Sequence, residues 1–230
     1  MLASKIIMKK NPYSRLQPKT RKPYTVVYLI RHANPDYRLE KKLGDCLMPL
    51  SAEGKRQAKF LAKRLQALSP DIVYASSLAR AQETAAVFAN LPRLKVKVDE
   101  RLDEIDWKDW YRVRYFRTSE ERRKQYLPGY LELDQQLNKK QAQTRRFLAD
   151  IFAQHRGKSV ALFCHGNIIK TFLTGIINAD VLGFLSLEIY QASISKLVID
   201  GDGYVKIGFI NDVNHLPNPP LEDIFITLVE

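Results

Sequence analysis

Short apolar segments rich in β-branched residues alternate with longer segments of helical periodicity along most of this chain of 230 residues. Strand-like segments occupy residues 24–32, 71–76, 95–102 and 159–166, and helical periodicity runs through 52–68, 79–90, 141–155 and 167–177. Residues 193–210 form two strand-like halves around a Gly-Asp-Gly sequence, which predicts a hairpin. This alternation predicts a three-layer α/β/α fold with a mostly parallel central sheet and one antiparallel edge strand.

The composition is that of one folded domain, which we expect to span residues 24–230. A hydrophobic content of 45% suffices for one substantial core, and neither internal repeats nor an interdomain linker is visible. The chain contains no run of 18 apolar residues and no secretory signal at its start, so a membrane span is not expected. The two cysteines, Cys46 and Cys164, are too few for a disulfide framework and favour reduced thiols in a cytoplasmic protein.

Much of the net charge of +12 is concentrated in residues 1–23. This segment holds seven Lys and Arg residues and no acid, so the remaining chain carries only about +5. A basic, flexible tail can contact nucleic acid or an anionic membrane, or simply be solvated. The charge on the rest of the chain is consistent with a site that attracts anionic substrates.

Two of the predicted parallel strands end in histidine. The first runs into Arg31-His32 and the later one into Cys164-His165-Gly166. The carboxyl ends of parallel strands meet at one edge of a sheet, where open α/β folds bind their ligands. His32 and His165 are therefore expected side by side, although a histidine at a strand end can also have a purely structural role. Cys164 is expected in the core.

The two other strand ends supply an arginine and an acid. Arg80 lies in the first turn of the helix after 71–76, where it can bind an anion or face solvent. Glu104 follows the strand-like segment 95–102 and precedes aromatic residues that can desolvate it and raise its pKa. Several cations with a single acid suit the binding and transfer of a phosphoryl group.

The same segments resemble the histidine phosphatase superfamily, the phosphoglycerate mutase-like fold. Arg31-His32-Ala33 is similar to its Arg-His-Gly signature, and residues 49–65 resemble its Pro-Leu-Thr-x-x-Gly-x-x-Gln-Ala helix. Residues 74–85, "YASSLARAQETA", resemble its Ser-Ser-x-x-x-Arg-Ala-x-x-Thr-Ala segment. "RLDEIDWKDW", "CHGN", "QASISKLVID" and "INDVNHL" are similar to its later segments, in the family's order.

This resemblance implies a phosphomonoesterase that needs neither metal nor cofactor and acts on a small phosphorylated metabolite. His32 would be the nucleophile that forms a phosphohistidine, and Glu104 would protonate the leaving oxygen and then activate water. His165 would donate to the phosphoryl group in the transition state. The expected phosphate-binding residues are Arg31, Arg80, Arg38 and Gly166.

Departures from the family's pattern keep alternatives open. Ala33 replaces a glycine, and Arg38 stands where many members have asparagine, so it either reaches the substrate or faces solvent. The Ser, Trp and Asn that mutases carry after Arg-His-Gly are absent, which disfavours phosphoglycerate mutase-type transfer. A phosphoprotein phosphatase and a non-catalytic phosphate-binding or interaction module remain alternatives. We expect residues 110–140 to form a helical lid that either selects the substrate or is a solvated excursion.

Overall fold

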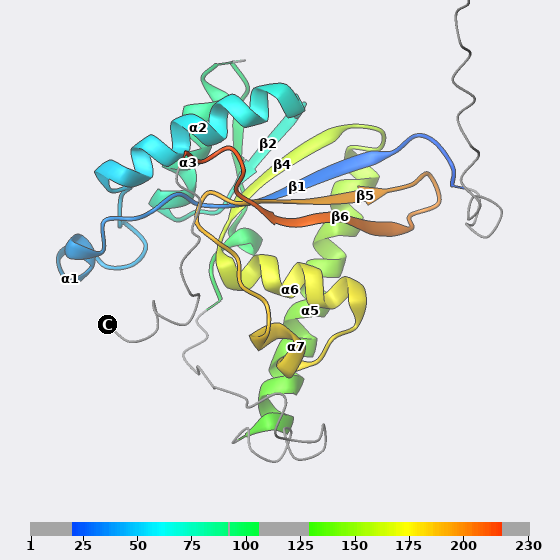
Figure 1. Cartoon of the computed structure of the whole chain (residues 1–230). Coiled ribbons are helices and arrows are strands. Elements are labelled where there is room, and N and C mark those ends of the chain that lie inside the picture. The colour runs from blue at the N-terminus through cyan, green and yellow to red at the C-terminus, as the bar shows by residue number, and fades with distance from the viewer. Residues whose placement is uncertain (1–19, 92, 106–128, 218–230) are drawn as a thin grey trace, which may run out of the picture.

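The computed structural model describes residues 20–91, 93–105 and 129–217, which build a six-stranded sheet between helices (Figure 1). The strands are β1 Thr25–Arg31, β2 Ile72–Ala75, β3 Val96–Val98, β4 Ser159–Cys164, β5 Ile194–Ile199 and β6 Val205–Asp212. Their order across the sheet is β3-β2-β4-β1-β5-β6. β3, β2, β4 and β1 are parallel, whereas β5 is antiparallel to both β1 and β6. The predicted mostly parallel sheet with an antiparallel edge is confirmed; β6, the second half of the hairpin, is the edge strand on that side, and β3 is the opposite edge.

The helices form one layer on each side of the sheet (Figure 1). α2 (Ala52–Leu68) and α3 (Ala79–Ala89) cover one face. α5 (Tyr130–Gln154) and α6 (Gly166–Ile177) cover the other, and α7 (Val181–Leu185) packs against this second pair. Three short elements complete the described part, namely η2 (Tyr37–Leu39), α1 (Glu40–Leu43) and η3 (Glu100–Leu102).

The start of α2 follows from its sequence. Ser51 is the N-cap, and its hydroxyl accepts a hydrogen bond of 3.0 Å from the backbone N–H of Gly54. The helix then buries residues at helical spacing against the sheet, among them Leu61 and Leu65, which are fully buried. This confirms the predicted cap and the predicted apolar face.

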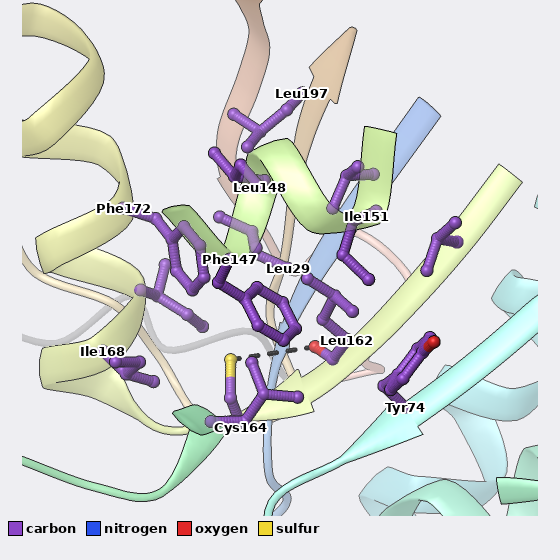
Figure 2. Close-up of a cluster of buried hydrophobic side chains, with 14 of the residues drawn as sticks. Leu29, Tyr74, Phe147, Leu148, Ile151, Leu162, Cys164, Ile168, Phe172 and Leu197 are labelled. Atoms are coloured by element: carbon purple, nitrogen blue, oxygen red, sulfur yellow. Dashed lines mark hydrogen bonds between the residues drawn. The ribbon is translucent and has the colours of Figure 1, made fainter. Parts of the chain in front are cut away.

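Both faces of the central strands are buried, which explains their continuous apolar sequence. In β1, Val27 and Leu29 belong to the cluster beneath α5 and α6, whereas Tyr28 and Ile30 face α2 and α3. Figure 2 shows the first cluster, in which Phe147 of α5 and Phe172 of α6 pack over Leu29 and Leu162. Burying each such large apolar side chain contributes about 1.5–3 kcal/mol. The sheet that carries the strand ends is therefore firmly held between the two layers.

α5 is longer than the sequence predicts, since it begins at Tyr130 and not near residue 141. Its first part is mostly polar, but Leu133 and Leu137 pack against Val181 and Phe184 of α7. These two leucines are one helical turn apart, so they form a narrow apolar stripe on an otherwise polar surface. This stripe is buried only because α7 packs against it. The extra helical turns thus depend on tertiary packing.

Two of the predicted regions lie largely outside the described residues. Of the expected basic tail 1–23 only residues 20–23 are described, and they are exposed ahead of β1. Of the expected lid 110–140, the part up to residue 128 is not described, and residues 130–140 belong to α5. Among the described helices, none is both long and apolar enough to cross a membrane.

Candidate active site

The parallel pairing of β1 and β4 places His32 beside His165. Arg31 is opposite Cys164 in the register of the two strands, and the next residue along each strand direction is a histidine. The backbone N–H of His32 donates to the carbonyl of Cys164 over 2.9 Å, and the two imidazole rings are 5.0 Å apart between centroids. Both side chains are buried. The expected juxtaposition at the carboxyl edge of the sheet is therefore present.

The backbone carbonyl of Ala33 determines which ring nitrogen of His32 carries the proton. Its Nδ1 lies 2.8 Å from the carbonyl oxygen of Ala33, which can only accept, so Nδ1 carries the proton. The Nε2 atom of the neutral ring then presents a lone pair. Burial, followed by the charges of His165 and Arg31, holds the pKa of His32 well below the usual histidine value. His32 is therefore a neutral imidazole with an available lone pair on Nε2, the form that a nitrogen nucleophile requires.

The side chain of Arg31 lies next to Gly166 at the start of α6. A β-carbon added to Gly166 would lie 3.4 Å from Nε of Arg31, which is an ordinary van der Waals distance, so the position of the guanidinium does not require a glycine here. Nη1 of Arg31 donates to the carbonyl of Ile189, which anchors the side chain. Its Nε is buried and has no hydrogen-bond partner among the residues described here. A buried, unused donor of this kind is suited to an anionic ligand.

Arg80 lies in the first turn of α3 and is 4% exposed. Its Nη1 donates to the backbone carbonyl of Asp45 over 2.7 Å, and the Asp45 carboxylate lies 3.1 Å from the same nitrogen. Thr84 of the same helix donates to the carbonyl of Arg80 and accepts from the backbone N–H of Ala33 over 3.1 Å. These two hydrogen bonds fix the position of α3 relative to the segment after His32.

Glu104, two residues beyond η3, supplies an acid to the same region. Burial raises the pKa of Glu104, and this rise is partly opposed by two backbone N–H groups and by the charges of Arg31 and Arg80. The nearer N–H is that of Ile105, at 2.9 Å from Oε1, and the N–H of Asn167 lies 3.5 Å from Oε2. A carboxyl group with a raised pKa beside two arginines is suited to holding and releasing a proton.

His165 is oriented by Ser76 at the end of β2. Its Nε2 is 2.8 Å from the Ser76 hydroxyl, which in turn donates to Asp103 over 2.7 Å. Burial, then the charges of Arg80 and Arg31, lowers the pKa of His165 well below the usual value. In the unliganded site both histidines are therefore neutral.

Three further residues singled out by the sequence do not contribute their side chains to this cluster. Arg38 is not brought to this cluster: its side chain is 86% exposed and pairs with Asp36 at 2.7 Å within the η2 turn. Cys164 is fully buried among the apolar side chains of Figure 2, and burial raises the pKa of its thiol far above the usual value. This confirms its expected place in the core. Ala33, in place of the usual glycine, is not among the described residues with a positive φ, so its methyl group causes no backbone strain.

Sequence reasoning assigned no role to several supporting residues. Ser76 and Thr84 lie within "YASSLARAQETA", so the signal was present in the segment that resembles the family. Asp45 gave no signal, because its contact with Arg80 depends on the path of the loop before α2. Lys170 is a buried lysine of α6 whose pKa is lowered by burial; the charge of Glu188 opposes this shift. A lysine within the apolar run "NIIKTFL" is the sequence feature from which its burial could have been predicted.

Five groups thus converge at the carboxyl edge of the sheet: His32, His165, Arg31, Arg80 and Glu104. The two arginines offer charged donors, His32 offers a lone pair, and Glu104 offers a proton. This combination matches what in-line transfer of a phosphoryl group requires: charge stabilisation for the transferred group, a nucleophile and an acid for the leaving oxygen.

Comparisons with known proteins agree with this geometry. The chain is 25% identical over 210 residues to the "Probable phosphoglycerate mutase GpmB" of Enterobacter sp. (strain 638), covering 86% of this chain and 98% of the relative. It is 28% identical over 181 residues to Phosphoserine phosphatase 1 of Hydrogenobacter thermophilus, covering 74% and 84%. Among solved structures, the fold is similar to that of a phosphoserine phosphatase from Entamoeba histolytica in complex with 3-phosphoglyceric acid, with a TM-score of 0.66 and 24% identity. The match covers 84% of this chain and 99% of that one.

The family model of the histidine phosphatase superfamily (branch 1) matches residues 27–212. This match begins in β1 and ends with the last residue of β6, so it includes every residue of the cluster described above. The fold, the order of the motifs and the match together lead to one conclusion: the chain belongs to the histidine phosphatase superfamily.

Proposed function

We propose that the protein is a phosphomonoester hydrolase that acts on a small phosphorylated metabolite through a phosphohistidine at His32. The hydrogen bond from Nδ1 of His32 to the carbonyl of Ala33 carries this proposal most directly. It leaves the Nε2 lone pair free in a buried site with two arginines. The phosphatases among the relatives, and membership of the family, support the same reaction class.

In the first half-reaction, Arg31 and Arg80 bind the non-bridging oxygens of the substrate phosphate. Nε2 of His32 attacks phosphorus in line, so that an N–P bond forms while the P–O ester bond breaks. Glu104 gives its proton to the leaving oxygen, and the alcohol departs. Because its pKa is raised by burial, Glu104 can hold this proton until the bond breaks.

In the second half-reaction, the Glu104 carboxylate accepts a proton from a water molecule as the water oxygen attacks phosphorus. The N–P bond breaks, inorganic phosphate forms, and His32 returns to its neutral state with the proton still on Nδ1. Glu104 is protonated again, so the site is ready for another turnover. Every step uses side chains of this chain, and we propose that no metal ion is required.

Phosphate release from an aryl phosphate, from phosphoserine and from 3-phosphoglycerate tests this proposal, with EDTA present throughout. We expect turnover by the wild type and a loss of about 10³-fold or more in His32→Ala, since removal of a covalent nucleophile abolishes the main route. Turnover that survives this substitution contradicts the proposal. Turnover that requires an added divalent metal contradicts its metal-free part.

Phosphoglycerate mutase-type transfer is the second candidate, because several relatives carry that name. Hydrolysis requires only that water reaches the phosphohistidine, whereas a mutase must return the phosphoryl group to its substrate. Product analysis with 3-phosphoglycerate separates the two: we expect inorganic phosphate and glycerate, and an isomeric phosphoglycerate without phosphate release would instead identify a mutase.

We also infer a cytoplasmic location, which the two cysteines support. Cys46 is an exposed free thiol and Cys164 is a buried one, as is usual in a reducing compartment. Fractionation of the native host cells tests this inference. Recovery of the protein in the membrane or secreted fraction contradicts it.

A further inference from the structure

A chain of hydrogen bonds runs from Asp103 through Ser76 to His165. The Ser76 hydroxyl donates to Oδ1 of Asp103 over 2.7 Å, and Nε2 of His165 lies 2.8 Å from the same hydroxyl oxygen. Ser77 fixes the carboxylate further, with its backbone N–H at 2.7 Å from Oδ1 and its hydroxyl at 2.6 Å from Oδ2. The three segments lie after η3, at the end of β2 and at the end of β4, so the chain links neighbouring strand ends.

The direction of these hydrogen bonds determines the tautomer of His165. A hydroxyl group has one proton, and Ser76 gives it to Asp103. The Ser76 oxygen therefore acts only as an acceptor toward its other two neighbours, the backbone N–H of Leu78 at 3.1 Å and Nε2 of His165. Nε2 of His165 consequently carries a proton, and in the neutral ring Nδ1 carries a lone pair.

That lone pair is buried in the same cluster as the residues proposed to bind phosphate. His165 has no exposed surface, and its Nδ1 has no hydrogen-bond partner among the residues described here. The charged and titratable groups around the ring are His32 and Arg31 from the end of β1 and Arg80 from α3, while Asp103 is linked to it through Ser76. Glu104, from the segment after η3, interacts with the same two arginines. Without a ligand, the two arginines disfavour a positive charge on the ring.

A bound phosphate changes this and favours a positive charge on the His165 ring. The three non-bridging oxygens of a phosphomonoester dianion, and the three unprotonated oxygens of inorganic phosphate as HPO₄²⁻, have only lone pairs, so they cannot form a hydrogen bond with an unprotonated Nδ1. Once the ring takes up a proton, Nδ1–H donates to a phosphate oxygen while Nε2–H continues to donate to Ser76. The resulting imidazolium lies between the phosphate and the Asp103 carboxylate, and such charge-assisted hydrogen bonds are about twice as strong as neutral ones.

We propose that Asp103 is a positioning residue that acts through Ser76, so that binding of a phosphate dianion loads a proton onto Nδ1 of His165. This proposal rests on the proposed function, because it assigns His165 a state in the same reaction. The proton comes from solvent: an O–H bond of the solvent breaks, the Nδ1–H bond of the ring forms, and no bond to phosphorus changes in this step. The loaded imidazolium then donates to the phosphoryl oxygens as their charge changes during transfer.

The direct test is ¹⁵N NMR of the histidine side chains in the full chain, with inorganic phosphate as the probe. The chain has four histidines, so His165→Gln is sufficient to assign the His165 signals. We expect Nε2 of His165 to be protonated without phosphate and both nitrogens to be protonated with saturating phosphate at pH 8. A free enzyme with the proton on Nδ1, or a complex in which Nδ1 stays unprotonated, overturns the proposal.

Calorimetric titration of phosphate in two buffers of different ionisation enthalpy measures the same event as a proton count. We expect uptake of roughly one proton per phosphate at pH 8. Glu104→Gln should retain most of this uptake, which excludes Glu104 as the group that is protonated. Loss of the uptake in Glu104→Gln assigns the proton to Glu104 and overturns the proposal.

Asp103→Asn tests the positioning residue, and Ser77→Ala is its control. Asparagine keeps the shape but not the charge, so we expect phosphate to bind about tenfold more weakly at pH 8, with less proton uptake. Ser77→Ala removes one contact to Asp103 but leaves the link to Ser76, and should change neither quantity by more than about twofold. Equal behaviour of the two variants overturns the role of Asp103. Turnover through His32 can persist in that case, so this failure is distinct from failure of the proposed function.

Discussion

The carbonyl oxygen of Asn34 lies 2.0 Å from the position that a β-carbon on Gly54 would occupy. Asn34 is two residues beyond His32, and its carbonyl also accepts from the backbone N–H of Ser51 over 3.0 Å. The glycine in the first turn of α2 therefore lets the loop after β1 rest directly on the helix. The position of His32 depends on this close backbone contact.

Gly54→Ala is expected to destabilise the protein and to impair turnover. The added methyl group meets rigid backbone, so the loop after His32 must move; overpacking of this kind costs about 1–3 kcal/mol. Thermal or urea unfolding measures the loss. Gly208→Ala is the control, because its β-carbon would meet Lys196 only at ordinary contact distances, 3.4 Å from the side chain and 3.5 Å from the backbone carbonyl oxygen. Equal stability of the two variants would contradict the importance of the Asn34 contact.

The pH dependence of kcat/KM for an alkyl phosphate should be bell-shaped. His32 must be neutral to attack, and its pKa is lowered, so activity is lost only when the pH falls well below the usual value of 6.5. Glu104 must be protonated, and its pKa is raised above 4.5, so activity falls as the pH rises through that raised pKa. In Glu104→Gln the alkaline limb assigned to Glu104 should disappear. Its persistence would show that another group sets that limb.

The effect of Glu104→Gln should depend on the leaving group. For alkyl phosphates, loss of the general acid is expected to lower kcat by about 10²–10⁴-fold. For an aryl phosphate with an electron-withdrawing ring the loss should be much smaller, because the departing phenolate needs no proton. Glu100→Gln, an exposed acid of η3, serves as the control. Equal losses on both substrates in Glu104→Gln would argue against proton donation by this residue.

Asp45→Asn should strengthen phosphate binding. Asp45 pairs with Arg80 at 3.1 Å and is 55% exposed, so its negative charge competes with a bound anion for the guanidinium. We expect the inhibition constant of inorganic phosphate to fall by about two- to fivefold, an effect that salt should reduce. Asp36→Asn is the matched control, because that carboxylate pairs with the exposed Arg38. A similar change in both variants would indicate only a long-range effect of net charge.

The sheet and its flanking helices could be predicted because the relevant signals are local. In β1, Val27 and Leu29 point to one buried face of the sheet, and Tyr28 and Ile30 point to the other. Ser51, a residue type that often caps helices, marks the start of α2. The early start of α5 could not be predicted, since Leu133 and Leu137 are buried only by α7.

In the candidate site, too, some features follow from the sequence pattern, whereas others depend on the tertiary structure. Parallel strands bring the ends of β1 and β4 to one edge, so the pairing of His32 with His165 could be expected from topology. Arg38 differs, because its local ion pair with Asp36 competes with any role at the site. The link from Asp103 through Ser76 to His165 joins three strand ends and depends on distances that no spacing in the sequence encodes.

Detection of the phosphoenzyme tests the central claim most directly. The wild type is mixed with an aryl phosphate, quenched within milliseconds in alkali, which preserves phosphohistidine, and digested for mass spectrometry. We predict one phosphoryl group on His32, and none in His32→Ala, which should also have lost turnover. A phosphoryl group on any other residue, or full turnover by His32→Ala, would contradict a phosphohistidine mechanism at His32.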